Sequence, residues 1–164
     1  METIQFAPDG YIPNNPFLPL ICYRAVFDLG ARDREHAIIR HFAANGWGDA
    51  WINGIYPFQH YHATAHEVLG IARGRALVQF GGTHGPKLEV SAGDAVMIPA
   101  GVGHYRLDMS SDLSVVGAYP AGADLRRDSA GDHQGAATRI AAVPLPRLDP
   151  VTGAAFTVSA SDGA

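Results

Sequence analysis

The sequence predicts a single all-β domain built from short strands and tight turns. Nineteen glycines and eleven prolines are spread through 164 residues, between short apolar runs. This composition favours turns between strands over long helices. Residues 75–80 alternate, with Ala76, Val78 and Phe80 on one face, as expected of a half-buried barrel wall. One domain of this length buries about 70% of the surface of its unfolded chain.

Composition excludes several classes of function. The net charge of -4 argues against a surface for nucleic acid or an anionic membrane, because such a surface needs a basic patch. Cys22 is the only cysteine, so neither an internal disulfide nor a cysteine-based zinc cluster can form. The amino terminus lacks the features of a signal peptide, and no stretch has the apolar length of a membrane span. We therefore expect a cytoplasmic protein whose partner is a small-molecule ligand.

The first part of the chain is expected to form an arm, a strand and the one short helix of the fold. Residues 1–19 are rich in Pro and Asn, which exclude a central strand. They are apolar enough to dock on the barrel as an extended arm. The apolar run 20–27 predicts the first strand. Asp33 is placed to cap a helix near 34–45, and the Asn-Gly pair at its end is suited to stop it.

The barrel itself is expected to span residues 20–120. Further strands are expected at three short apolar runs, residues 88–90, 95–98 and 113–119. Residues 121–164 are expected to form an extension that packs on the barrel. Within it, the sequence predicts a loop over 123–138 and an extended segment over 140–148.

The stretch from Gly54 to Gly74 concentrates potential metal ligands. In a strand, His60 and His62 share a face, with Tyr61 on the other. Their Cα atoms would lie about 6–7 Å apart, because each residue rises about 3.3 Å. Two imidazoles at this spacing can bind one metal ion, whose bonds to nitrogen are about 2.0–2.2 Å long.

A carboxylate on the next predicted strand is the third candidate ligand. Glu67, Leu69 and Ile71 share one face of this strand, whereas His66 and Val68 share the other. If the apolar pair faces the interior, Glu67 faces it too, and Glu67 is then the expected ligand. A bulge at the start of the strand would reverse the choice, so His66 remains an alternative ligand.

A second stretch, from Gly93 to His104, supplies His104 as the fourth candidate ligand. On the strand that follows, His104, Arg106 and Asp108 are expected to share a face. An inward Arg106 would suit an anionic substrate group such as a carboxylate. An Arg106 at the barrel rim would instead pair with Asp108, and the sequence favours this second arrangement.

Two tryptophans, Trp47 and Trp51, precede the first metal-binding stretch. Aromatic side chains at the mouth of a barrel can line a ligand pocket. Core packing where the helix joins the barrel is equally compatible with the sequence. Both interpretations remain open at this stage.

Together the two stretches resemble the conserved motifs of the cupins. G-x5-H-x-H-x4-E-x6-G matches the first cupin motif without a mismatch, and G-x5-P-x-G-x2-H matches most of the second. The second motif usually ends in Asn, where this chain has the charged Asp108. The resemblance implies a double-stranded β-helix, or jelly-roll barrel. It also implies a divalent metal ion bound by four side chains, His60, His62, Glu67 and His104.

More narrowly, the chain is similar to small bacterial cupins of the YjlB type. The similarity is carried by NNPFLP, HYHATAHEVLG, AGDAVMIPAGVGH, GAYP and VPLPRLDPVTG, which are spread over most of the chain. Cupins of this size commonly dimerise by extending a sheet, so the resemblance also implies a homodimer.

The expected ligand set suits several divalent metals. Three imidazoles and one carboxylate bind Fe, Mn, Ni, Co or Zn, and ligand type alone does not choose among them. We expect a metal-dependent enzyme of the dioxygenase or isomerase type that acts on a small polar molecule. Glu67 could leave the metal and act as a base, with Tyr105 or Arg106 near the substrate. The alternatives are a non-catalytic protein that senses or stores a small ligand through the metal, and a metal-free isomerase.

Overall fold

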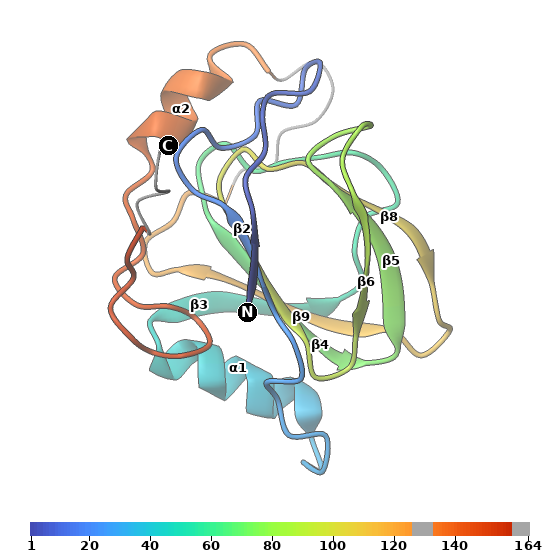
Figure 1. Cartoon of the computed structure of the whole chain (residues 1–164). Helices are drawn as coiled ribbons and strands as arrows, with labels where there is room; N and C mark the ends of the chain where they lie inside the picture. The colour runs from blue at the N-terminus through green and yellow to red at the C-terminus, as the bar shows by residue number, and fades with distance from the viewer. Residues whose placement is uncertain (126–132, 159–164) are drawn as a thin grey trace.

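The computed structural model describes residues 1–125 and 133–158, whose strands form two antiparallel sheets around one core (Figure 1). Residues 126–132 and 159–164, parts of the predicted carboxyl-terminal extension, lie outside the described residues. The larger sheet has the order β1-β2-β7-β4-β9-β3, and the smaller has the order β6-β5-β8. The strands are β1 (Glu2–Ile4), β2 (Leu20–Tyr23), β3 (Trp47–Asn53), β4 (Glu67–Arg73), β5 (Arg75–Phe80), β6 (Lys87–Ser91), β7 (Ala95–Ile98), β8 (His104–Met109) and β9 (Ser114–Pro120). The predicted all-β jelly-roll barrel is confirmed.

The space between the two sheets is filled by apolar side chains that alternate along the strands. β4 contributes Leu69 and Ile71, and β5 contributes Ala76, Val78 and Phe80, each no more than 2% exposed. Alternate side chains of a strand point to opposite faces, so the intervening residues of β4 face outward. The alternation predicted for β5 is confirmed, and the residues of β4 expected to face inward do so.

The helix α1 (Arg34–Ala44) covers the outer face of the larger sheet (Figure 1). Asp33 caps it as predicted, because its Oδ1 atom accepts a hydrogen bond of 3.1 Å from the backbone N–H of His36. The helix buries Ile38 against β4 at a point where the strand carries Gly70. A Cβ atom at Gly70 would lie 2.6 Å from Cγ2 of Ile38, so this close approach requires glycine.

The amino-terminal segment is anchored to the barrel by two buried asparagines. The side-chain amide of Asn14 donates a hydrogen bond to the carbonyl oxygen of Gly81 at 2.9 Å. The amide of Asn15 donates to the carbonyl oxygen of Ala100 at 3.0 Å. The segment adds only β1, at the edge of the larger sheet. Its prolines therefore stay out of the sheet interior, as their missing N–H groups require.

The prediction of a single helix is wrong, because a second helix, α2 (Ala136–Ala142), lies where a loop and then an extended segment were expected. Its sequence, AATRIAA, is rich in alanine, the best helix former. Ala136 and Ile140 belong to the same buried apolar cluster as Tyr61, and such packing stabilises a helix too short to form alone. Neither α1 nor α2 is long and apolar enough to cross a membrane, and no other helix among the described residues is.

The first predicted strand is shorter than expected. It was predicted over 20–27, but β2 ends at Tyr23. Ala25 has a φ of 51°, a left-handed conformation that interrupts a strand. Its backbone N–H donates to Oδ1 of Asp94 at 3.0 Å, instead of to a neighbouring strand. The apolar run alone did not reveal this side-chain interaction.

Candidate metal centre

Three histidines form a buried cluster inside the barrel. His60 and His104 are cross-strand neighbours, joined by two backbone N–H···O bonds of 3.3 and 3.0 Å. His62 lies two residues beyond His60. The ligand nitrogens of the three residues lie within 4.8 Å of one another, and all three side chains are buried. Two nitrogens bound to one ion lie at most about 4.4 Å apart, so small side-chain rotations would suffice for shared binding.

Backbone carbonyl groups orient two of these rings. The Nδ1 atom of His60 lies 3.0 Å from the carbonyl oxygen of Phe58, and Nδ1 of His104 lies 3.1 Å from that of Val102. Because a carbonyl oxygen can only accept, each Nδ1 carries the proton. Burial and then the neighbouring His104 lower the pKa of His60 to about 2, so this ring is neutral. Its Nε2 atom then presents a lone pair, the arrangement typical of a metal ligand.

Glu67 places a carboxylate oxygen against the same cluster. Its Oε2 atom lies 3.1 Å from Nε2 of His62 and 3.6 Å from Nε2 of His104. Burial acts to raise the pKa of Glu67, but its electrostatic interactions with the nearby His62 and His104 side chains outweigh burial and hold that pKa below its usual range. Oε2 is buried, and no described residue hydrogen-bonds to it with acceptable geometry.

This arrangement fits a divalent cation. The negative charge of the Glu67 carboxylate can be balanced either by protons on the Nε2 atoms of His62 and His104 or by a cation between these side chains. Burial lowers the pKa of His60 in this cluster, because burial disfavours the charged form. A divalent metal between the side chains would supply the positive charge. His60, His62, His104 and Glu67 would be its ligands.

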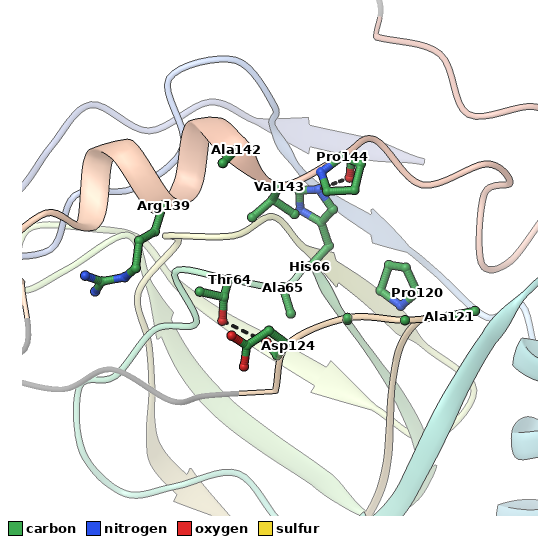
Figure 2. A pocket seen from close by; sticks show the side chains of 12 residues that line it. Thr64, Ala65, His66, Pro120, Ala121, Asp124, Arg139, Ala142, Val143 and Pro144 are labelled. Carbon is green, nitrogen blue, oxygen red and sulfur yellow. Dashed lines mark hydrogen bonds between the residues drawn. The ribbon is translucent and has the colours of Figure 1, made fainter.

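His66, the alternative ligand, directly precedes β4, and both nitrogens of its ring are hydrogen-bonded to other parts of the backbone. Its Nδ1 atom accepts a hydrogen bond of 2.9 Å from the backbone N–H of Ala100, and its Nε2 atom donates to the carbonyl oxygen of Pro144 at 3.2 Å. Figure 2 shows its ring reaching toward Pro144, beside a separate cavity of about 360 Å³ between the barrel and α2. Burial lowers the pKa of His66 to about 4. Both ring nitrogens are occupied, so His66 joins the barrel to the carboxyl-terminal segment.

A short chain of hydrogen bonds holds the other oxygen of Glu67. The indole N–H of Trp51 donates to the hydroxyl oxygen of Tyr119 at 2.9 Å, and this hydroxyl donates to Oε1 of Glu67 at 3.5 Å. An indole N–H can only donate, so the Tyr119 hydroxyl accepts from Trp51 and its own proton is directed to Glu67. Oε1 is therefore held from the β9 side while Oε2 faces the histidines. Nothing in the local pattern of β9 singles out Tyr119, which is one of several alternating residues on that strand.

A β-bulge in β3 decides where the two tryptophans point. Trp47 and Trp51 are four apart and would share a face of a regular strand. The pairing of β3 with β9 shifts by one residue between Gly48 and Trp51, and Asp49 has a φ of 49°. Trp47 therefore packs beneath α1 on the outer face of the larger sheet, whereas Trp51 lies beside the histidine cluster. Core packing therefore describes Trp47, and lining of a cavity describes Trp51.

Close packing of Trp51 on β9 requires a glycine opposite it. Trp51 pairs with Gly117 across the two strands. A Cβ atom at Gly117 would lie 2.0 Å from the Trp51 indole. Gly117 therefore leaves the space in which the indole lies across β9 and reaches Tyr119.

A two-part cavity leads away from the histidines. The inner cavity has a volume of about 30 Å³, and its lining includes Trp51, Tyr56, His60, Glu67, Leu69 and His104. The outer cavity has a volume of about 480 Å³, and its lining includes Trp51, Asn53, Tyr56, Arg106 and Tyr119. Trp51 and Tyr56 line both cavities, so the two cavities adjoin at these residues.

The three polar residues expected near His104 do not share one face of β8. Arg106 pairs with Val78, which faces the inner core, so Arg106 is on the inner face of β8. Tyr105 lies on the outer face between His104 and Arg106, and the structure does not bring it to the site. The expectation that Asp108 shares the face of His104 is wrong. The pairing of β8 with β5 skips one residue before Asp108, so that side chain turns outward.

Arg106 and Asp108 do not form the ion pair that was expected at the barrel rim. The carboxylate of Asp108 lies 3.9 Å from Nη1 of Arg75, on the neighbouring strand. The guanidinium of Arg106 lies against the sulfur of Met109. The charge at position 108, where the second cupin motif usually has Asn, therefore lies outside the barrel.

Comparison with known proteins identifies the family of this chain. No protein-family model matches the chain. A Bacillus subtilis (strain 168) protein, described as uncharacterized protein YjlB, is 41% identical over 155 residues, which are 93% of this chain and 90% of the relative. The chain belongs to the YjlB-like cupins. The family expected from the motifs is therefore confirmed.

Solved structures similar to this YjlB-like cupin are more distant. Acireductone dioxygenase from Bacillus anthracis, with a cadmium ion in its active centre, matches with a TM-score of 0.42 and 17% identity over 57% of this chain. The match spans 63% of that enzyme, less than two thirds of its length. RmlC from Streptococcus suis, in complex with dTDP-D-xylose, matches with a TM-score of 0.34 and 16% identity, over 52% of this chain and 50% of that chain.

Proposed function

We propose that the protein is a divalent-metal-dependent enzyme that acts on a small molecule. The observation that carries this proposal is the convergence of three buried histidines and the Oε2 atom of Glu67, which accepts no hydrogen bond of acceptable geometry, beside a cavity. Four protein ligands would leave two positions of an octahedral metal for water, substrate or O₂. A bound metal would supply Lewis-acid or oxygen-binding chemistry there.

The residues of the chain would divide the remaining work. His60 and His104 would hold their Nε2 atoms in place through their carbonyl-bound Nδ1 atoms. Glu67 would bind the metal through Oε2, and a Glu67 that left the metal would become a base. Arg106 would contact the substrate in the outer cavity. Reaction types compatible with this set are oxygenation with iron, and isomerisation or elimination with manganese, nickel, cobalt or zinc.

Metal content is the first test of the proposed function. We expect a near-stoichiometric divalent metal in untagged protein purified without chelator, measured by elemental analysis. The His62→Ala variant should contain at most a small fraction of that metal. Iron would direct the activity assays to O₂ uptake, and another metal would direct them to isomerase and lyase reactions. Protein that neither contains metal nor takes up any of the five candidate metals would refute the proposal.

The homodimer expected from the resemblance is also a proposal. β1 is the edge strand of the larger sheet, and a second copy could pair with it. Phe17, next to this edge in a groove that Met1 also lines, is 66% exposed. Light scattering in solution should give twice the monomer mass of 17.4 kDa. A monomer at high protein concentration would contradict this proposal.

A further inference from the structure

The size of the cavity limits which part of a ligand can approach the histidines. The inner cavity, about 30 Å³, has room for only two or three water-sized groups, because each needs about 10–15 Å³. The outer cavity, about 480 Å³, lies within the range of about 300–1,000 Å³ found for small-molecule pockets. The body of a ligand must therefore occupy the outer cavity, with only one small group directed toward the metal site.

The charges that line the two cavities favour an anion. Arg106 is the cationic side chain among the described residues of the outer cavity, and Glu67 is the acidic residue of the inner one. A divalent cation bound by one carboxylate retains a positive charge, and Arg106 adds another. The cavities therefore attract a negatively charged molecule and repel a cationic one.

Arg106 is positioned to bind the charged end of such a ligand. It lies on the inner face of β8, opposite the buried Val78 and two residues from His104. Its Cα atom and that of His104 are therefore about 7 Å apart. No carboxylate among the described residues lies within ion-pair distance of Arg106. Its planar guanidinium, resting against Met109, can bind a carboxylate through two parallel hydrogen bonds.

Aromatic rings form the walls between these two ends. Trp51 and Tyr56 line both cavities, and Tyr119 lines the outer one. Tyr56 also stacks on Phe58, with ring centroids 5.0 Å apart, which adds a second ring behind it. Flat aromatic surfaces favour contact with a flat apolar group of the ligand.

We infer that the natural ligand is a small, flat carboxylate. Its carboxylate binds Arg106, its apolar body lies between Trp51 and Tyr56, and one oxygen at its other end enters the inner cavity. The inference rests on the proposed metal-dependent function for the role of that last oxygen. The Arg106 contact does not depend on the metal, so the two can be tested separately.

The test compares three probes of similar size and different charge. Benzoate, benzamide and benzylamine are titrated calorimetrically into zinc-loaded and metal-free protein, after zinc content is measured. Benzoate should bind at least tenfold more tightly than benzamide, and benzylamine should not bind measurably. Because a hydrogen bond to a charged group contributes about 1.5–3 kcal/mol, Arg106→Gln should weaken benzoate binding about ten- to hundredfold. The same variant should leave benzamide affinity and zinc content unchanged.

Arg75→Gln is the matched control, because Arg75 carries the same charge on the neighbouring strand but lies outside the cavities. It should leave benzoate binding unchanged. Equal affinities for benzoate and benzamide, or equal losses in both arginine variants, would overturn the inference. Failure of all probes to bind would overturn it as well. A protein that binds no zinc but still shows an Arg106-dependent preference for benzoate would refute the metal proposal and retain this one.

Discussion

His66 and Glu67 are adjacent in the chain, and both are almost fully buried, with 1% and 3% of their surface exposed. They differ in what their polar atoms contact. Both ring nitrogens of His66 have backbone partners, on Ala100 and Pro144. Glu67 has one oxygen in contact with Tyr119, and its other oxygen faces His62 and His104 without a hydrogen bond of acceptable geometry.

The difference shows that burial of a polar residue does not by itself identify a functional site. Nearly all buried polar groups in folded proteins have a hydrogen-bond partner. A buried group whose partners are all present in the fold, such as His66, is explained by stability. A buried carboxylate such as Glu67, whose Oε2 atom faces two other potential ligands without a hydrogen bond of acceptable geometry, supports the proposal of a bound cation. Three substitutions test this distinction.

Glu67→Gln is expected to have the largest effect. It keeps the shape of the side chain but removes the charge that faces the histidines. Zinc affinity, measured against a competing chelator, should fall by more than about a hundredfold, which exceeds the loss typical of a residue behind the ligands. The melting temperature of the metal-free protein should change little, because the amide has the same shape and its NH2 group can donate a hydrogen bond to a facing histidine nitrogen. Unchanged zinc affinity would show that Glu67 is not a ligand.

His66→Leu should show the opposite pattern. It leaves the buried N–H of Ala100 without its partner, whereas the exposed Pro144 can turn its carbonyl to water. A buried group without a partner costs about 1–3 kcal/mol, so denaturant titration of the metal-free protein should show a loss of roughly 1–3 kcal/mol. Zinc stoichiometry should be unchanged. Loss of zinc at unaltered stability would instead make His66 a ligand. His84→Leu, at an 88% exposed side chain, controls for the loss of a histidine.

Tyr119→Phe should have a smaller effect, on the metal site alone. Burial, and then the charge of Glu67, raise the pKa of Tyr119, so the hydroxyl remains a donor to Oε1 throughout the neutral range. Without it, Glu67 is free to rotate, and zinc affinity should fall about tenfold, at the lower end for residues behind a ligand. The visible absorption of the cobalt-substituted protein should shift. Tyr11→Phe, at an exposed tyrosine, should change neither property.

The spacing of residues along the chain determined much of this architecture. Alternation in β5, the cap at Asp33 and the pattern of glycines and prolines depend on interactions within a few residues. They predict strands, α1 and turns correctly because each is a local property. The His60-x-His62 spacing likewise brings two ligands to one face of the chain.

Interactions between distant strands decided the rest. A bulge where β3 meets β9 turns Trp51 toward the histidine cluster and leaves Trp47 on the outer face of the sheet. A second bulge, in β8, turns Asp108 away from the histidine cluster. α2 forms where its apolar residues meet Tyr61 and its neighbours. A bulge is set by pairing with a partner strand that can be many residues away. The sequence by itself therefore determined the barrel and its candidate ligands, and the tertiary structure decided which side chains surround them.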